Sequence, residues 1–268
     1  MLVITIYISI AMRWFIIFFA ILSSQFIFSQ VITGNNHADT LSISPFNISV
    51  ETNSFKIYQW KNGAIVPCAL ILAGVAILIP DAHCSISNYS IQKNVPKIFT
   101  GCASPVDNYL QFAPLAAVYG LKAAGIKSRN SLINQFALSL KSELLMGLIV
   151  QGMKSTIEAR RPSGGMHSMP SGHTAQAFVS ATMLDMEYRD TSPWISIAGY
   201  ASATTTAIYR MINNEHWISD VLIGAGIGIF TTKLVYFTHR YHVGLKNNTV
   251  IMPTPLYHGA GITFAMVF

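Results

Sequence analysis

The chain carries little charge. Only 10% of its 268 residues are charged, whereas 51% are hydrophobic. A water-soluble domain of this length usually carries more charge on its surface, so we expect a membrane-embedded or lipid-facing protein. Acidic residues are fewer than basic residues, and the net charge is +6. That excess favours anionic partners such as phosphorylated lipids, although basic residues in cytoplasmic loops would give the same sign.

Cysteine is also scarce. Cys68, Cys84 and Cys102 lack the spacing of zinc ligands, which argues against a zinc site and allows at most one disulfide. Cys84 and Cys102 form the one plausible pair, and free thiols are an equal alternative. No internal repeat is visible in the sequence.

The N-terminal segment differs from the rest of the chain. Residues 1–29 are apolar with Arg13 as their only charge, which indicates a signal peptide or a membrane anchor. Met12 precedes a run of signal-peptide length, so we hypothesise that translation starts there, with cleavage near Ser29-Gln30. N-terminal sequencing that found residues 1–11 on the mature protein would exclude this. Residues 30–63 predict an irregular lead-in segment.

Hydrophobic periodicity predicts an all-α fold for the main domain, residues 64–240. Five long helices are expected at 105–123, 131–153, 172–188, 193–210 and 217–238. Residues 64–80 form a shorter apolar stretch interrupted by Pro67 and Pro80. The C-terminal tail, residues 241–268, ends in alternating apolar residues that predict a short β-hairpin or an extended tail.

Membrane topology remains open from the sequence. If both 12–29 and 64–80 span, the loops around 154–172 and 211–216 face the cytoplasm; if only one spans, with the N-terminus inside, they face out. Counting Lys and Arg favours the second arrangement. Polar residues inside the expected helices keep a soluble periplasmic bundle as a third possibility; they are Asp107, Gln111, Lys141, Glu143, Asp185 and Glu187.

Two cations lie near the end of the expected helix 131–153. Lys154 and Arg161 are seven residues apart, so a helix continued to Pro162 would place both on one face. An Arg fork suits two phosphate oxygens, and Lys adds a compact charge. Taken alone, the pair also suits snorkelling residues at a helix end.

A second motif precedes the helix expected at 172–188. Pro170 and Ser171 stand before Gly172 and His173, so Ser171 is a candidate N-cap. The free N–H groups at the helix start can bind an anion, and His173 could protonate a leaving oxygen. An ordinary N-cap with an incidental histidine is the structural alternative.

The third motif joins the last two expected helices. Asp220 follows His216 by four residues, so its carboxylate could hold one imidazole nitrogen and leave the other free to attack. Arg210 would supply a third cation. A structural His–Asp hydrogen bond is the alternative for the pair alone.

The three motifs together resemble the signature of the type 2 phosphatidic acid phosphatase superfamily, in order and in spacing, from Lys154 to Asp220. The resemblance implies a six-helix core. It implies that His216 is the nucleophile that forms a phosphohistidine, Asp220 its partner and His173 the general acid. The phosphate-binding residues it implies are Lys154, Arg161, Ser171, Gly172 and Arg210, and no metal or other cofactor would be required. The chain departs from the family pattern at Tyr209, where Ser is usual, and His167 is expected to be a loop histidine.

The resemblance implies a phosphatase acting on a phosphate monoester or pyrophosphate. The substrate would be a lipid of the phosphatidic acid, phosphatidylglycerol phosphate, polyprenyl pyrophosphate or lipid A type. We expect a location in the inner membrane of a bacterial-type envelope, with the site facing the periplasm and no nucleic acid as partner. The alternatives are a soluble periplasmic acid phosphatase, a vanadium-dependent haloperoxidase and a non-catalytic membrane component.

Overall fold

The computed structural model describes residues 40–43, 46–50, 57–79, 87–239, 241–245, 249–256 and 259–266. The proposed signal or anchor with its Met12 start, and Cys84, lie outside these ranges. Cys102, the other half of the disulfide that the sequence allows, is a free, exposed thiol. The described helices are α2 (Ile57–Ile77), α3 (Asn88–Ile98), α4 (Asp107–Leu110), α5 (Ala113–Ala123), α6 (Leu132–Thr156), α7 (Gly172–Tyr188), α8 (Pro193–Ile212) and α9 (Ile218–Thr238).

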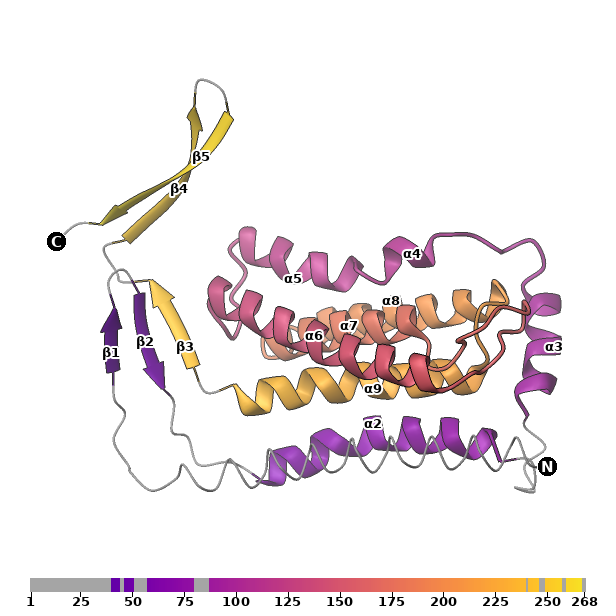
Figure 1. Cartoon of the computed structure of the whole chain (residues 1–268). Helices are drawn as coiled ribbons and strands as arrows, with labels where there is room; N and C mark the ends of the chain where they lie inside the picture. The colour runs from indigo at the N-terminus through magenta and orange to yellow at the C-terminus, as the bar shows by residue number, and fades with distance from the viewer. Residues whose placement is uncertain are drawn as a thin grey trace.

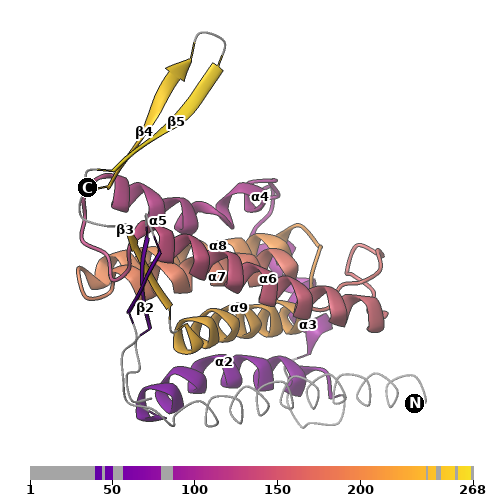
Figure 2. The same ribbon diagram turned by 60° about the vertical axis from the view of Figure 1, so that its left-hand side comes forward.

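Helix α7 is the centre of the bundle. It packs against α5, α6, α8 and α9, and α9 packs on its other side against α2 (Figures 1 and 2). Most of α7 is buried, including Ala175, Val179 and Met183. The predicted all-α core is therefore confirmed, and a single helix touches nearly every other element that supports the motifs.

Glycines allow α9 to approach its neighbours closely. A Cβ atom on Gly224 would lie 2.6 Å from the Ser171 carbonyl oxygen, and one on Gly228 would lie 2.4 Å from the Ala175 oxygen. Gly226, on the opposite side of α9, leaves the same kind of space for the Pro67 oxygen of α2. Small residues at this spacing let helix backbones touch, as is common in membrane bundles.

Three helices differ from the predicted bounds. The expected helix 105–123 is two helices, because Pro114 in the first turn of α5 starts a new helix after α4. Helix α6 ends at Thr156 and does not continue to Pro162. Helix α2 begins at Ile57 and runs through Pro67. The short helix α3 was not predicted; Ser87 caps it in a capping box with Ser90.

The described strands lie beyond one end of the bundle (Figure 1). Strands β1 (Thr40–Ile43) and β2 (Phe46–Val50) form an antiparallel sheet with β3 (Tyr241–Leu245), which follows α9. Strands β1 and β2 thus lie within residues 30–63, where the sequence predicts irregular structure. The sequence does not reveal them because β2 pairs with a strand about 200 residues away. Strands β4 (Thr249–Leu256) and β5 (Gly259–Met266) form an antiparallel hairpin in the C-terminal tail.

We predict that Gly228→Ala destabilises the protein. Its Cβ would meet backbone atoms of α7, so the two helices must separate, at a cost of about 1–3 kcal/mol. Gly120→Ala on α5 is the matched control, because a Cβ there meets nothing within 4 Å. Thermal unfolding in detergent should show a lower Tm for Gly228→Ala only. Equal Tm values for the two variants would contradict the close-packing account.

Candidate active site

The three motifs lie together at the end of the bundle where α3 and α4 are found (Figure 1). Backbone hydrogen bonds join the two loops that carry them. Ser163 N donates to Asn214 O at 3.0 Å, and Ser171 N donates to Asp220 O at 3.0 Å. The Trp217 indole N–H also donates to Arg160 O at 2.7 Å. Residues distant in sequence are thereby held in one site.

Lys154 and Arg161 do not share a helix face. Lys154 is in the last turn of α6, whereas Arg161 lies in the loop that follows Thr156. This loop turns back at Gly164 and His167, both with positive φ. Lys154 Nζ donates to His167 O at 2.8 Å, and His167 Nδ1 lies 2.8 Å from Lys154 O. The predicted helical continuation is wrong because the chain folds into this turn, and His167 is part of it.

Arg161 and Arg210 share one anionic partner. Glu215 Oε2 is bound by Arg161 Nη1 and lies 3.4 Å from Arg210 Nη2. Arg210 also donates through Nη1 to Asp107 Oδ2 at 2.7 Å, and both of these side chains are buried. Two guanidinium groups from different motifs are therefore close enough to hold a single oxygen atom.

His216 and Asp220 are buried side by side. His216 Nδ1 lies 3.6 Å from Asp220 Oδ2, a close contact that is longer than a hydrogen bond. Asp220 Oδ2 instead accepts hydrogen bonds from the backbone N–H of Trp217 at 3.0 Å and from the Ser168 hydroxyl. The direct hydrogen bond expected from the sequence is thus not formed. Burial lowers the pKa of His216 more than the nearby Asp220 raises it, which favours the neutral imidazole.

His173 is the second residue of α7, two positions after the N-cap Ser171. Its Nε2 lies 2.9 Å from Asn108 Oδ1. Burial, followed by the positive charge of Arg210, lowers the pKa of His173 to about 4. The first N–H groups of a helix have no partner inside it, so those at the start of α7 can bind an anion. Ser171 and Gly172 lie at this helix start, as the sequence predicts.

Four polar residues of the site were missed by sequence reasoning. Asp107, Asn108, Ser168 and Glu215 each contact a motif residue through their side chains. Glu215 adjoins His216 in the sequence, and Ser168 stands just before the second motif. Their nearness to motif residues in the sequence is the one signal that could have indicated a place in the site. Tyr209 is half-buried on α8, next to Arg210. In the described ranges, no group of three or more His, Cys, Asp or Glu could hold a metal ion.

Known proteins resemble this chain in sequence and in structure. A curated relative from Porphyromonas gingivalis, named lipid A 1-phosphatase, is 38% identical over 165 residues, which are 59% of this chain and 37% of the relative. The chain thus spans well under half the length of that relative. Aquifex aeolicus LpxE is 20% identical with a TM-score of 0.38, covering 60% of this chain and 92% of the other. A transmembrane PAP2 type phosphatidylglycerolphosphate phosphatase from Bacillus subtilis is 21% identical with a TM-score of 0.49, covering 64% and 94%.

The family match is broader than any of these. The sequence pattern of the PAP2 superfamily matches residues 64–243, which make up more than half of the chain. The matched range contains all three motifs and helices α3 to α9. The chain therefore belongs to the PAP2 superfamily.

Proposed function

We propose that this chain is a metal-independent phosphatase that hydrolyses a lipid phosphate monoester or pyrophosphate through a phosphohistidine. One observation carries the proposal: two buried or half-buried histidines face a group of cations, two of which already share an anionic oxygen. Family membership supports the same chemistry. A phosphate group would replace Glu215 between Arg161 and Arg210, with Lys154 and the N–H groups at Gly172 and His173 binding its other oxygens.

The geometry supports a role for each histidine. Asp220 lies on the Nδ1 side of His216, so Nε2 is the nitrogen that attacks phosphorus. The Asp220 carboxylate then stabilises the positive charge on the imidazole. His173 gives a proton to the leaving oxygen, and the bound phosphate raises its pKa by offsetting the positive charge of Arg210. Water finally cleaves the P–N bond, with His173 accepting its proton.

A lipid substrate is supported by the outer face of α6. Large apolar side chains repeat every four residues along this face and are exposed: Leu132, Phe136, Leu140, Leu144 and Leu148. Helices α6 and α9 are long and apolar enough to cross a membrane. The curated relative is named for lipid A, which makes a lipid A type phosphate the first substrate to test. These features support the lipid class over the small esters of a soluble acid phosphatase.

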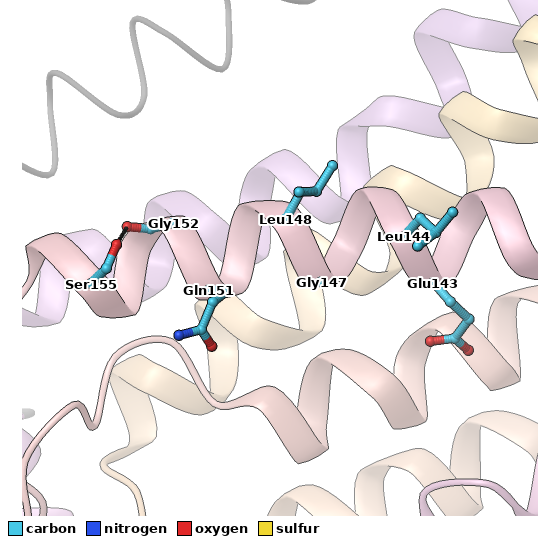
Figure 3. Close-up of a pocket in the computed structure, with 7 residues that line it drawn as sticks. All are labelled: Glu143, Leu144, Gly147, Leu148, Gln151, Gly152 and Ser155. Atoms are coloured by element: carbon cyan, nitrogen blue, oxygen red, sulfur yellow. Dashed lines mark hydrogen bonds between the residues drawn. The ribbon is translucent and has the colours of Figure 1, made fainter.

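A shallow, open groove of about 470 Å³ runs along one face of α6, the helix whose last turn carries Lys154. Its lining includes Glu143, Gly147, Gln151 and Ser155, and Figure 3 shows Glu143 and Gln151 pointing to one side of the helix. Lys154 follows Gly147 by seven residues, so both lie on the same face. An acyl chain in this groove would place its phosphate headgroup near Lys154.

The charges at the two ends of the bundle favour a site that faces the periplasm. Lys122, Lys127, Arg129 and Arg189 lie at the end opposite the motifs, where Arg129 pairs with Asp190 at 2.8 Å. At the motif end, outside the motifs themselves, the described basic residues are Lys93, Lys97 and Arg160. Basic loops tend to remain in the cytoplasm, which leaves the motif end outside.

We predict that His216→Ala reduces phosphate release by at least about a thousandfold, because the nucleophile is lost. His239→Ala, at the other end of α9, is the control. Wild-type protein should release phosphate from lipid A, phosphatidic acid, phosphatidylglycerol phosphate or polyprenyl pyrophosphate faster than from a soluble ester, with chelator present. It should also form a labelled phosphoenzyme that is stable in alkali and lost in acid.

Three results would count against the proposal. Full turnover in His216→Ala would exclude the nucleophile. Loss of activity with chelator would exclude the metal-free mechanism. A preference for the soluble ester would favour an acid phosphatase, and bromination with vanadate and peroxide would favour a haloperoxidase.

We predict that Gly147→Leu raises KM for a long-chain lipid phosphate about tenfold, because the new side chain fills the groove and displaces one to two methylene contacts. A Cβ on Gly147 meets nothing within 4 Å, so folding should be unaffected. Gly120→Leu, equally open, is the matched control. Turnover of a water-soluble phosphate ester should be unchanged in both variants. An unchanged KM for the long-chain lipid would exclude the groove as its binding site.

We predict that a membrane-impermeant thiol reagent labels Ser163→Cys but not Ala124→Cys in intact cells of a bacterial host, in a background without native cysteines. Both positions are exposed, and they lie in loops at opposite ends of the bundle. The reverse pattern would place the site in the cytoplasm, and labelling of both would exclude a membrane-spanning bundle.

A further inference from the structure

We infer that Asp107 and Asn108, neighbours on the short helix α4, are positioning residues that orient Arg210 and His173 for phosphoryl transfer. The inference rests on the proposed function and extends it to an element outside the three motifs. Helix α4 lies about fifty residues before the first motif in the sequence. In the structure its two polar residues contact two different groups of the site.

Asp107 fixes the direction of the Arg210 guanidinium group. Its Oδ2 accepts from Nη1 at 2.7 Å, and its side chain is only 1% exposed. A buried carboxylate is costly unless it is paired, so Asp107 has to stay bonded to the guanidinium group and thereby holds it in one direction. With Nη1 occupied, Nη2 points toward Glu215, which stands where we place a phosphate oxygen.

A hydrogen-bonded clamp fixes α4 to the end of α8. Asn213 Nδ2 donates to Ser104 O at 2.9 Å and to Asp107 Oδ1 at 3.3 Å, while Ser104 N donates to Asn213 Oδ1 at 3.2 Å. Asn213 is the C-cap of α8, three residues after Arg210. Both partners of the buried ion pair are therefore held by the same contact.

Asn108 selects the tautomer of His173. An amide oxygen can only accept, so the 2.9 Å contact between Asn108 Oδ1 and His173 Nε2 places the proton on Nε2. Neutral imidazole has one N–H group, so Nδ1 keeps the lone pair. Nδ1 is then the nitrogen that takes up a proton and passes it to the leaving oxygen, while the Nε2–H bond to Asn108 remains in place.

Charged and titratable groups from four parts of the chain face His173 and set its proton affinity. They are Arg210 on α8, Asp107 on α4, His216 before α9 and Lys154 on α6. Asn108, which contacts His173, carries no charge, and it is exposed. Its replacement should therefore alter the proton affinity of His173 with little effect on folding.

Opposite shifts of the pH profile test this inference. In Asn108→Asp, a carboxylate beside the imidazole raises the pKa of His173 by about one unit or more, so the basic limb of kcat moves to higher pH. In Asn108→Ala, the acceptor for Nε2–H is lost, so the limb moves to lower pH. Asn94→Asp is the matched control: Asn94 is exposed on α3 and donates to Ser90 O. Its profile should equal that of the wild type.

Asp107→Asn tests the other half of α4. The shape is kept but the charge opposite Arg210 is lost, so KM should rise and kcat should fall. We expect kcat/KM to fall by about tenfold to a hundredfold, as when a residue that orients a metal ligand is removed. Because Asp107 also favours protonated His173, the basic limb should move to lower pH. Should this buried variant fail to fold, Asn108→Asp and Asn108→Ala still decide the question.

The outcomes separate this inference from the proposed function. A wild-type protein that releases no phosphate from any substrate overturns both. An active wild type that loses activity in His216→Ala, but keeps an unmoved basic limb in both Asn108 variants, overturns only the role of α4. A loss of kcat that is equal at every pH would show that Asn108 is merely structural, and would overturn it as well.

Discussion

The close contact between α7 and α9 is the constraint on which the site depends. Ser171 caps α7 and lies against Gly224, where a Cβ would be 2.6 Å from its carbonyl oxygen. The Ser171 N–H donates to Asp220 O, and Asp220 lies one turn before Gly224 on α9. Any side chain at Gly224 would separate the two helix starts, and with them His173 and His216. The lack of a side chain at Gly224 thus sets the distance between His173 and His216. The two helices that position them, α7 and α9, are also packed together in the bundle.

Charge neutralisation explains how so many cations can share one end of a chain with few charges. Asp107 pairs with Arg210, and Glu215 pairs with both Arg161 and Arg210. Like charges held this close repel one another unless carboxylates lie between them. The two carboxylates differ in burial: Asp107 is 1% exposed, whereas the side chain of Glu215 is 32% exposed. In the proposed mechanism the exposed carboxylate would move into water when phosphate binds, and the buried one would stay to hold the guanidinium group.

Much of this arrangement could be predicted from the sequence, and the limits have physical reasons. Helices α7, α8 and α9 begin within one residue of their predicted starts, because Ser171, Pro193 and the apolar run after Trp217 mark them locally. The turn at Gly164 and His167 is not local in this sense. Ser168 N donates to Ala159 O across the loop, and the Ser168 hydroxyl donates to the Asp220 carboxylate, which belongs to α9. Asp107 could be identified only as a costly charge within a helix; its partner Arg210 is 103 residues away.

The polar residues that made a membrane bundle doubtful have partners inside the fold. Glu187 accepts from Asn130, Gln135 and Tyr236, so its carboxylate joins α6, α7 and α9. Asp185 pairs with Arg189, Asp107 with Arg210, and Glu143 accepts from Gln176 across α6 and α7. Hydrocarbon penalises an ionisable group chiefly when it faces lipid alone. Glu187, Asp107 and Glu143 bond to neighbouring helices, and Asp185 bonds to the C-cap of its own helix. Because these carboxylates are paired while apolar side chains repeat along the outer face of α6, they no longer argue against a membrane.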